Sequence, residues 1–120
     1  MQYALLIYGD EDSPDARSED ERQEWYAEYA TLSADLRREG KFLGGEELQP
    51  VSTATAVRVR NGDTLVSDGP FAETKETLGA YCLIEADSLD EAIEWASRIP
   101  SARSGTVEIR PVVDNSEHRE

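Results

Sequence analysis

The sequence predicts a single domain of the α+β class, and three observations lead to that class. Two capping boxes, Ser18–Glu21 and Ser88–Glu91, each precede apolar residues at helical spacing and so predict two helices. Short apolar runs come before, between and after these helices, as strands would. The pair Asn61-Gly62 between two alternating segments indicates a tight β-hairpin. The 120 residues suit one core, so we expect one domain at residues 1–113 and a flexible tail at residues 114–120.

The first predicted elements are a central strand and a long helix. Residues Tyr3–Tyr8 are apolar on both faces, as is typical of a strand in the middle of a sheet. The helix should begin after Ser18 and end at Gly40, where basic residues suit the C-terminal end of the helix dipole. Its apolar positions predict one buried stripe, made of Trp25, Tyr29, Leu32 and Leu36.

The rest of the chain predicts further strands and a second helix. A short strand at residues 42–43 should be broken by Gly44-Gly45, which indicate a bend or a β-bulge. The second helix should stop before Pro100. Its predicted buried stripe is Leu89, Ala92, Ile93 and Ala96. The other predicted strands are the hairpin of residues 55–68, the strand Ala80–Ala86 and the strand Thr106–Val113.

The predicted order is strand, helix, hairpin strands, strand, helix, strand. It is that of a ferredoxin-like α+β subunit with an antiparallel sheet and an extra hairpin. Helices cover only one face of such a sheet. The strands Tyr3–Tyr8 and Ala80–Ala86 are nevertheless apolar on both faces. The sequence therefore predicts a homodimer in which two sheets pack face to face, a dimeric α+β barrel.

The charge of the chain limits the partners it can have. Lys and Arg number 12 and Asp and Glu number 26, which gives a formal net charge of -14. Such a surface repels phosphate backbones and anionic lipid, so we expect no nucleic-acid partner and no membrane partner. Solubility explains the charge, and a cationic protein partner also fits it.

Cysteine and histidine usage argues against several kinds of site. One Cys allows no intramolecular disulfide, and the start of the chain has no basic region, so we expect a cytoplasmic protein. No cofactor is expected, because the one His, His118, lies in the polar tail and is not available to bind one together with Cys82. The acidic loop Asp10–Asp15 has Asp15 where an EF-hand requires glycine, so no metal site is expected there.

The segment Ser67–Gly79 contains the candidate site, because it is longer and more polar than a plain connection requires. Asp68 either caps a turn or faces a cleft and acts as a general base, and it is the predicted catalytic residue. The charged residues that follow either form a solvated connector or complete a polar pocket with Asp68. The predicted ligand-binding residues are Phe71, Glu73, Lys75 and Glu76.

Side chains outside this segment allow two interpretations each. Glu46 or Glu47 could face a cleft beside the glycine pair. Arg58 and Arg60 alternate along one face of the hairpin, where they bind an anionic ligand or pair with acids of the protein. Cys82 lies in an apolar strand pattern, which predicts an unreactive buried thiol. Five aromatic residues line a ligand pocket or belong to the core or a dimer interface: Tyr8, Trp25, Tyr26, Tyr29 and Tyr81.

Four segments together resemble the YCII-related family: YALLIYGDE at the start, LGGEELQP, the stretch from TAVRVR to SRIP, and the closing VEIRPV. Residues Asp68 to Phe71 resemble the Asp-Gly-Pro-Phe motif that names one branch of this family. The resemblance covers residues 1–113 and implies a dimeric α+β barrel. It transfers only Asp68 as a functional residue, because the His–Asp pair of enzymes in the wider family has no His counterpart in residues 1–113. Members of the branch are commonly encoded beside extracytoplasmic-function sigma factors, which implies a regulatory setting.

Three hypotheses about function follow. The first is a small-molecule-binding protein or weak acid–base enzyme with a cleft near the dimer interface and with Asp68 as base or polar anchor. The second is a non-catalytic regulatory protein that acts with a sigma factor through its acidic surface. In the third, the Asp68–Phe71 motif is a rigid turn that sets the geometry of the dimer.

Overall fold

The structure is a computed structural model that describes residues 1–12 and 17–114. Asp15 of the acidic loop, His118 and the predicted tail from residue 115 onward lie outside the described residues. In chain order the elements are β1 (Gln2–Gly9), α1 (Glu19–Arg38), β2 (Phe42–Glu47), the 3₁₀ turn η1 (Val51–Thr53), β3 (Thr55–Arg60), β4 (Asp63–Asp68), β5 (Thr77–Glu85), α2 (Leu89–Ser97), the 3₁₀ turn η2 (Pro100–Arg103) and β6 (Thr106–Pro111).

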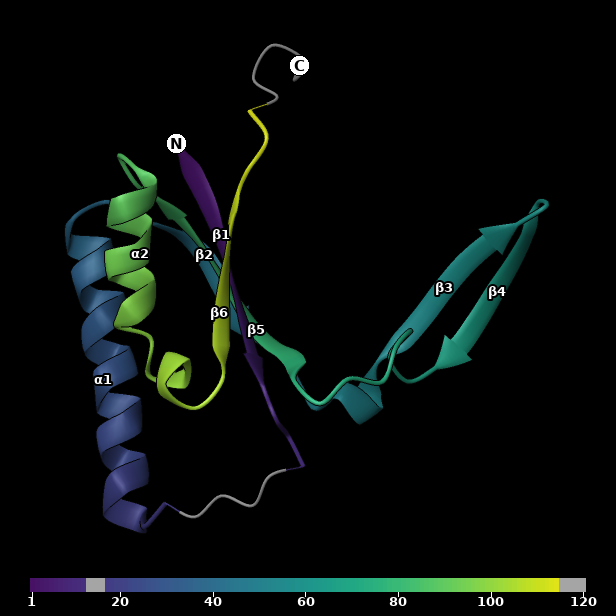
Figure 1. Cartoon of the computed structure of the whole chain (residues 1–120), viewed down its shortest axis with the longest axis horizontal. Coiled ribbons are helices and arrows are strands. Elements are labelled where there is room, and N and C mark those ends of the chain that lie inside the picture. Colours follow the sequence, from purple (N-terminus) through teal and green to yellow (C-terminus); the bar gives the residue numbers. More distant parts are fainter. Residues whose placement is uncertain (13–16, 115–120) are drawn as a thin grey trace.

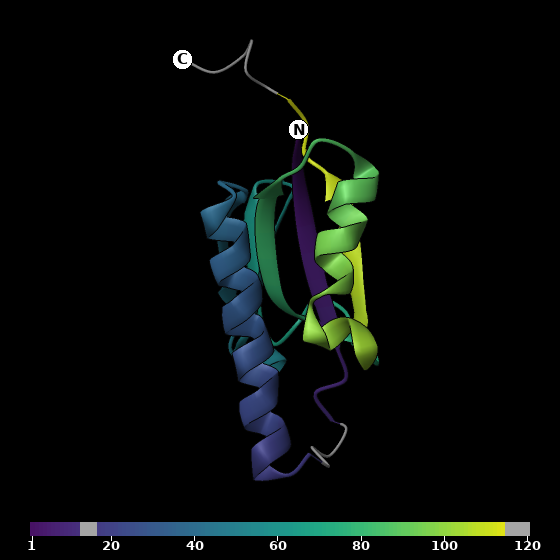
Figure 2. The ribbon, with the colours of Figure 1, turned by 90° about the vertical axis from the view of Figure 1, so that its left-hand side faces the viewer.

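A four-stranded sheet forms the centre of the molecule, with the strand order β2-β5-β1-β6. Each pair of neighbours is antiparallel. Both helices lie on one face of this sheet, in front of it in Figure 2. This is the ferredoxin-like α+β arrangement that the sequence predicts. The predicted extra hairpin is also confirmed: β3 and β4 form a separate two-stranded sheet that projects from the side without helices (Figure 1).

Helix α1 begins and ends where the sequence predicts. The Ser18 hydroxyl accepts a hydrogen bond from the Glu21 backbone N–H at 3.1 Å, and the Glu21 carboxylate accepts one from the Ser18 N–H. The helix ends before Gly40, whose φ of +69° is readily adopted by glycine alone. Of the predicted stripe, Leu32 and Leu36 are buried. Trp25 and Tyr29 are only half-buried, because the space beneath them is a cleft.

Two predictions about helix α2 are wrong in part. Its capping box is only half formed: Ser88 accepts from the Glu91 N–H, but the Glu91 carboxylate accepts from the Asp87 N–H instead. Trp95, which the predicted stripe omitted, is buried with Ala92 and Ala96. Leu89 and Ile93 are exposed by 50% and 47%. The large indole fixes which side of this short helix faces the sheet.

The prediction that Gly44-Gly45 breaks the second strand is wrong, whereas the predicted β-bulge is confirmed. Strand β2 continues through both glycines, and the pairing with β5 shifts by a bulge between Phe42 and Gly44. Gly45 then approaches β5 so closely that a Cβ atom there would lie 2.7 Å from the Tyr81 carbonyl oxygen. Glycine therefore permits close strand pairing here and does not end the strand.

The core lies between the sheet and the two helices. Alternate residues of β1, namely Tyr3, Leu5 and Ile7, are buried on the helix side. Ala4, Leu6 and Tyr8 point to the other face, as do their β5 partners Leu83, Tyr81 and Leu78. No element of the described chain forms a second layer over that face (Figures 1 and 2).

Candidate functional site

The Asp68–Phe71 segment forms a tight turn at the base of the hairpin. Asp68 is the last residue of β4 and is exposed. Its carboxylate accepts no hydrogen bond within residues 1–12 and 17–114. The turn is closed by the backbone instead, since the Gly69 N–H donates to the Ala54 carbonyl oxygen at 2.7 Å and Gly69 adopts a φ of +89°. The carboxylate of Asp68 thus does not cap this turn.

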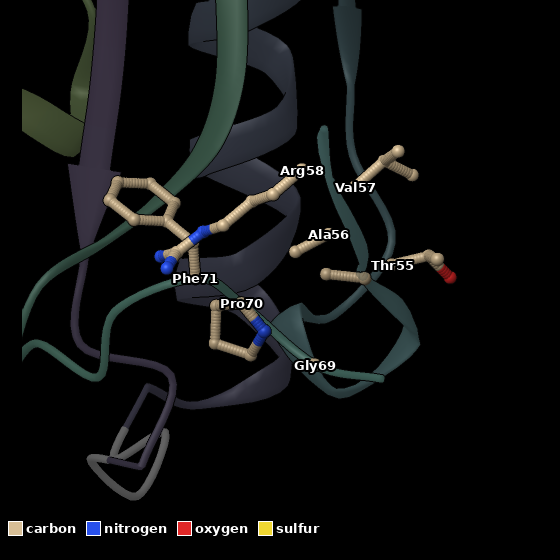
Figure 3. A pocket seen from close by; sticks show the side chains of 8 residues that line it. Thr55, Ala56, Val57, Arg58, Gly69, Pro70 and Phe71 are labelled. Atoms are coloured by element: carbon tan, nitrogen blue, oxygen red, sulfur yellow. The ribbon is translucent and has the colours of Figure 1, made fainter. Parts of the chain in front are cut away.

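Phe71 lies beside a shallow hollow of about 430 Å³ at the hairpin base. Figure 3 shows Pro70 and Phe71 on one side and the side chains of Ala56 and Arg58 directed toward them. All of the lining comes from residues 54–58 and 69–71, so the hollow is open away from the hairpin. Phe71 itself is 80% exposed, which is a high value for a large aromatic side chain.

The other predicted site residues lie apart from Asp68. Lys75 and Glu76 line a second, larger cleft, whereas Asp68 and Glu73 line neither hollow. The Glu76 carboxylate accepts a hydrogen bond from the Thr106 hydroxyl at 3.1 Å, which ties the loop to the start of β6. Within one chain, the structure does not bring Asp68 together with Lys75 or Glu76.

The larger cleft has a volume of about 1160 Å³ and lies between α1 and the helix-facing side of the sheet. Its apolar floor comes from β1 and β5 and includes Leu5, Ile7, Ala80 and Cys82. Its other wall is α1, and Ser101, Ser104 and Gly105 also belong to the lining. Of the five aromatic residues considered from the sequence, Trp25, Tyr26 and Tyr29 line this cleft from α1, whereas Tyr8 and Tyr81 border it from strands whose Tyr side chains point to the other face of the sheet. Glu46 and Glu47 also line it, in agreement with one of the interpretations for them.

A hydrogen bond between the Tyr29 hydroxyl and the Ser101 hydroxyl, 2.7 Å long, is the main polar feature inside the cleft. Burial raises the pKa of the Tyr29 phenol above its usual value, against the hydrogen bonds with Ser101, and the negative charge of Glu47 acts in the same direction as burial. Tyr29 is therefore neutral near pH 7 and offers a hydroxyl rather than a base. Sequence reasoning missed Ser101, because a serine in a short turn carries no recognisable pattern.

Burial also raises the pKa of the Cys82 thiol, so the thiol is protonated near neutral pH. This agrees with the predicted unreactive cysteine, although the side chain is half-buried and lines the cleft. In the described part of the chain, no group of three or more His, Cys, Asp or Glu side chains is placed to hold a metal ion. None of the helices described is both long and apolar enough to span a bilayer.

Acidic side chains outnumber basic ones in the lining of the cleft. The acids are Asp10, Glu11, Glu46, Glu47 and Glu76, and the bases are Arg17, Arg37 and Lys75. Two bases rest on aromatic rings: Arg17 lies 4.1 Å from the centre of the Trp25 ring, and Arg37 lies 4.5 Å from that of Phe42. Glu11 is engaged by the Val51 backbone N–H at 3.1 Å. Glu47 is an exposed acid of the lining, and its negative charge contributes to the raised pKa of Tyr29.

Comparison with known proteins finds a family model and a relative that each match almost the whole chain. A family model described as YCII-related domain matches residues 1–116. A protein of Rhizobium meliloti (strain 1021), named only as uncharacterized, is 37% identical over 114 residues. The match covers 93% of this chain and 92% of that protein.

Proposed function

The chain belongs to the YCII-related family, and we propose that it binds a small organic molecule in the cleft between α1 and the sheet. The observation that carries this proposal is the form of the cleft. It has apolar and aromatic walls, and the Tyr29–Ser101 pair lies within it. Ligand sites in proteins are typically concave and mostly apolar, with a few placed polar groups.

The charges of the lining indicate which kind of molecule fits. Trp25, Tyr29 and the aliphatic floor favour a flat or aromatic body. Acids exceed bases around the cleft, and Glu47 is the lining acid whose charge acts on Tyr29, so a positively charged nitrogen is favoured over a carboxylate or phosphate. The proposed ligand is therefore a small aromatic amine. The neutral hydroxyls of Tyr29 and Ser101 supply hydrogen bonds that orient it.

Intrinsic fluorescence tests this proposal, because both tryptophans of the chain, Trp25 and Trp95, line the cleft. Three probes share one ring and differ in charge: phenethylamine, 2-phenylethanol and phenylacetate. The amine should bind tightest. Glu47→Gln should weaken amine binding by about tenfold, which corresponds to the loss of one charge-assisted contact.

Glu73→Gln is the matched control, because Glu73 is an exposed acid that lines no hollow. It should leave amine binding unchanged. If none of the probes changes the fluorescence, or if phenylacetate binds tightest, the proposed ligand class is wrong.

Acid–base chemistry at Asp68 remains a prediction. Asp68 is exposed and lines neither of the two hollows described above. Asp68→Asn belongs in the same titration: weaker binding in this variant with normal binding in Glu47→Gln would move the site to the hairpin base.

We also propose that the protein is cytoplasmic and forms a homodimer through the uncovered sheet face. The motif Asp68-Gly69-Pro70-Phe71 supports membership of the branch named for it.

The second candidate function is a non-catalytic regulator that binds a basic segment of a sigma factor. The net charge of -14 favours it. Complex formation would weaken strongly with added salt, whereas binding of an amine inside a partly enclosed cleft would respond less. A salt series on both interactions separates the two functions.

A further inference from the structure

The β3–β4 hairpin gains almost no burial from its own chain. Every residue of β4 is exposed, and in β3 only Ala56 is half-buried. An isolated two-stranded hairpin is marginally stable at best in water. The arm, defined here as residues 55–68, therefore needs a surface that the described part of this chain does not provide.

The side chains of the arm are unsuited to permanent contact with water. Val57 pairs with Val66 and Val59 pairs with Thr64, so three valines share one face of the ribbon. These valines are exposed by 61%, 63% and 59%, in the order Val57, Val66 and Val59. The opposite face carries Leu65, also exposed, beside Arg58. An uncovered apolar ribbon of this kind indicates an interaction surface.

The turn at Gly69 fixes the direction in which the arm leaves the body. Gly69 has a φ of +89°, and its N–H closes the base of the arm through the Ala54 carbonyl oxygen. A Cβ atom at Gly69 would meet no atom within 4 Å, so glycine is required here for backbone conformation and not for space. Pro70 then holds its own φ near one value. The segment Asp68–Phe71 is therefore a rigid bend between the arm and the rest of the chain, and we call it the elbow.

We infer that the arm packs against a second copy of this chain, and that Asp68–Phe71 is the elbow that aims it. This inference rests on the proposed homodimer and extends it. The arm projects on the same side of the sheet as the uncovered face of β1 and β5 (Figure 1). In a dimer with two-fold symmetry, the uncovered sheet faces of the two copies pack together and the arm of each copy lies beside the four-stranded sheet of the other. The same surface of each copy then makes the sheet contact and the arm contact.

Charge also favours a second copy of this chain as the partner that covers the arm. Two chains of net charge -14 repel each other unless the contact is apolar or brings opposite charges together. The arm supplies both, because its valines are apolar and Arg58 and Arg60 are cations in an acidic protein. Phe71 at the elbow adds an exposed ring on the Arg58 side, as Figure 3 shows.

The test measures the dimer dissociation constant by sedimentation over a range of concentrations. The variant Val57→Thr/Val59→Thr/Val66→Thr keeps residues that favour strands and removes apolar surface. It should raise the dissociation constant by at least about tenfold. The control Leu89→Gln/Ile93→Gln removes exposed apolar surface from α2 instead and should leave the constant unchanged. Gly69→Ala should weaken the dimer with an unchanged far-ultraviolet circular dichroism spectrum.

The outcomes separate the arm from the dimer itself. If the wild type is monomeric, both the proposed homodimer and the proposed contact of the arm with a second copy are wrong. If the wild type is dimeric and the threonine variant dimerises equally well, only the proposed contact of the arm is wrong. Backbone amide exchange of residues 55–68 gives a readout that does not depend on any variant: it should be slow in concentrated wild type and fast on dilution. Fast exchange at every concentration contradicts the inference.

Discussion

The body of the molecule and its arm are stabilised in different ways. In the body, Leu5 and Ile84 are almost fully enclosed between the sheet and the helices, with exposures of 1% and 0%. In the arm, apolar side chains on both faces of a twisted ribbon remain exposed. Both regions have alternating or continuous apolar patterns in the sequence, yet only one finds a partner within the chain.

Polar contacts follow the same division. Asp35 of α1 binds Arg98 beyond the end of α2 at 2.5 Å, and Lys41 before β2 binds Glu91 of α2 at 3.3 Å. Among the residues described, no ion pair joins the arm to another part of the chain. The body therefore has an enclosed core and ion pairs between its own elements, whereas the arm has neither within the described residues and has the composition of an interface.

The body and the arm should differ most in how much free energy of unfolding is lost when an apolar side chain is truncated to Ala. Ile84→Ala removes a fully enclosed side chain on β5 and should lower the free energy of unfolding by about 2–5 kcal/mol. Val66→Ala in the arm should cost less than about 1 kcal/mol in dilute protein, because the side chain is already in water. Urea unfolding followed by circular dichroism measures both. Equal costs would show that the arm is covered even in the dilute protein.

A smaller effect is expected from the polar network at the start of α2. The Asp87 backbone N–H, the Trp95 indole N–H at 2.9 Å and Lys41 all contact the Glu91 carboxylate and hold its pKa below the usual 4.5. A carboxylate whose pKa is lowered by folding stabilises the fold above its usual pKa, and this contribution is lost as the pH falls through the lowered value. The melting temperature of the wild type should therefore drop more steeply below pH 4.5 than that of Glu91→Gln.

The neighbouring acid Glu94 supplies the control for this pH dependence, because it is exposed on the same helix. Glu94→Gln should retain the steep drop of the wild type. Because Glu91 is partly exposed, water screens these contacts and the effect should be modest. Parallel curves for the wild type and Glu91→Gln would mean that the network adds nothing to the stability of the body.

Local sequence signals predicted the body well where one chain contains all the interacting parts. Ser18 and Glu21 sit in the same helical turn, so their pattern alone predicted the start of α1. Asn61-Gly62 likewise predicted the hairpin turn. The burial of Trp95 was missed because it depends on which side of a short helix meets the sheet. Gly45 was misread because its close approach to Tyr81 comes from strand pairing, which the local sequence does not show.

The candidate site was harder to predict than the fold for the same physical reason. The cleft combines α1, the sheet and η2, and the Tyr29–Ser101 contact joins residues from distant parts of the chain. The rich polar composition of Ser67–Gly79 drew attention to Asp68, yet only Lys75, Glu76, Thr77 and Gly79 of that segment line the cleft. Local polarity identified an exposed turn, while the cleft arises from contacts between elements.

The smallest expected effect on the body comes from changing the tip of the arm. Gly62 has a φ of +81°, and a Cβ atom there would meet nothing within 4 Å. Gly62→Ala should therefore strain only the hairpin turn, by about 1–2 kcal/mol, and leave the melting temperature of dilute protein unchanged. Gly40→Ala is matched to it, since Gly40 also has a positive φ and open space, but it ends α1 in the body.

Scanning calorimetry of Gly40→Ala and Gly62→Ala at two protein concentrations tests whether the body and the arm unfold separately. Gly40→Ala should lower the melting temperature by several degrees at both concentrations, because it strains the folding unit itself. Gly62→Ala should lower it only at the high concentration, where the arm is held by a second copy and its strain is felt by the dimer. A fall of equal size for both variants in dilute protein would mean that the arm unfolds together with the body, so that the chain is one cooperative unit and the exposed valines need another explanation.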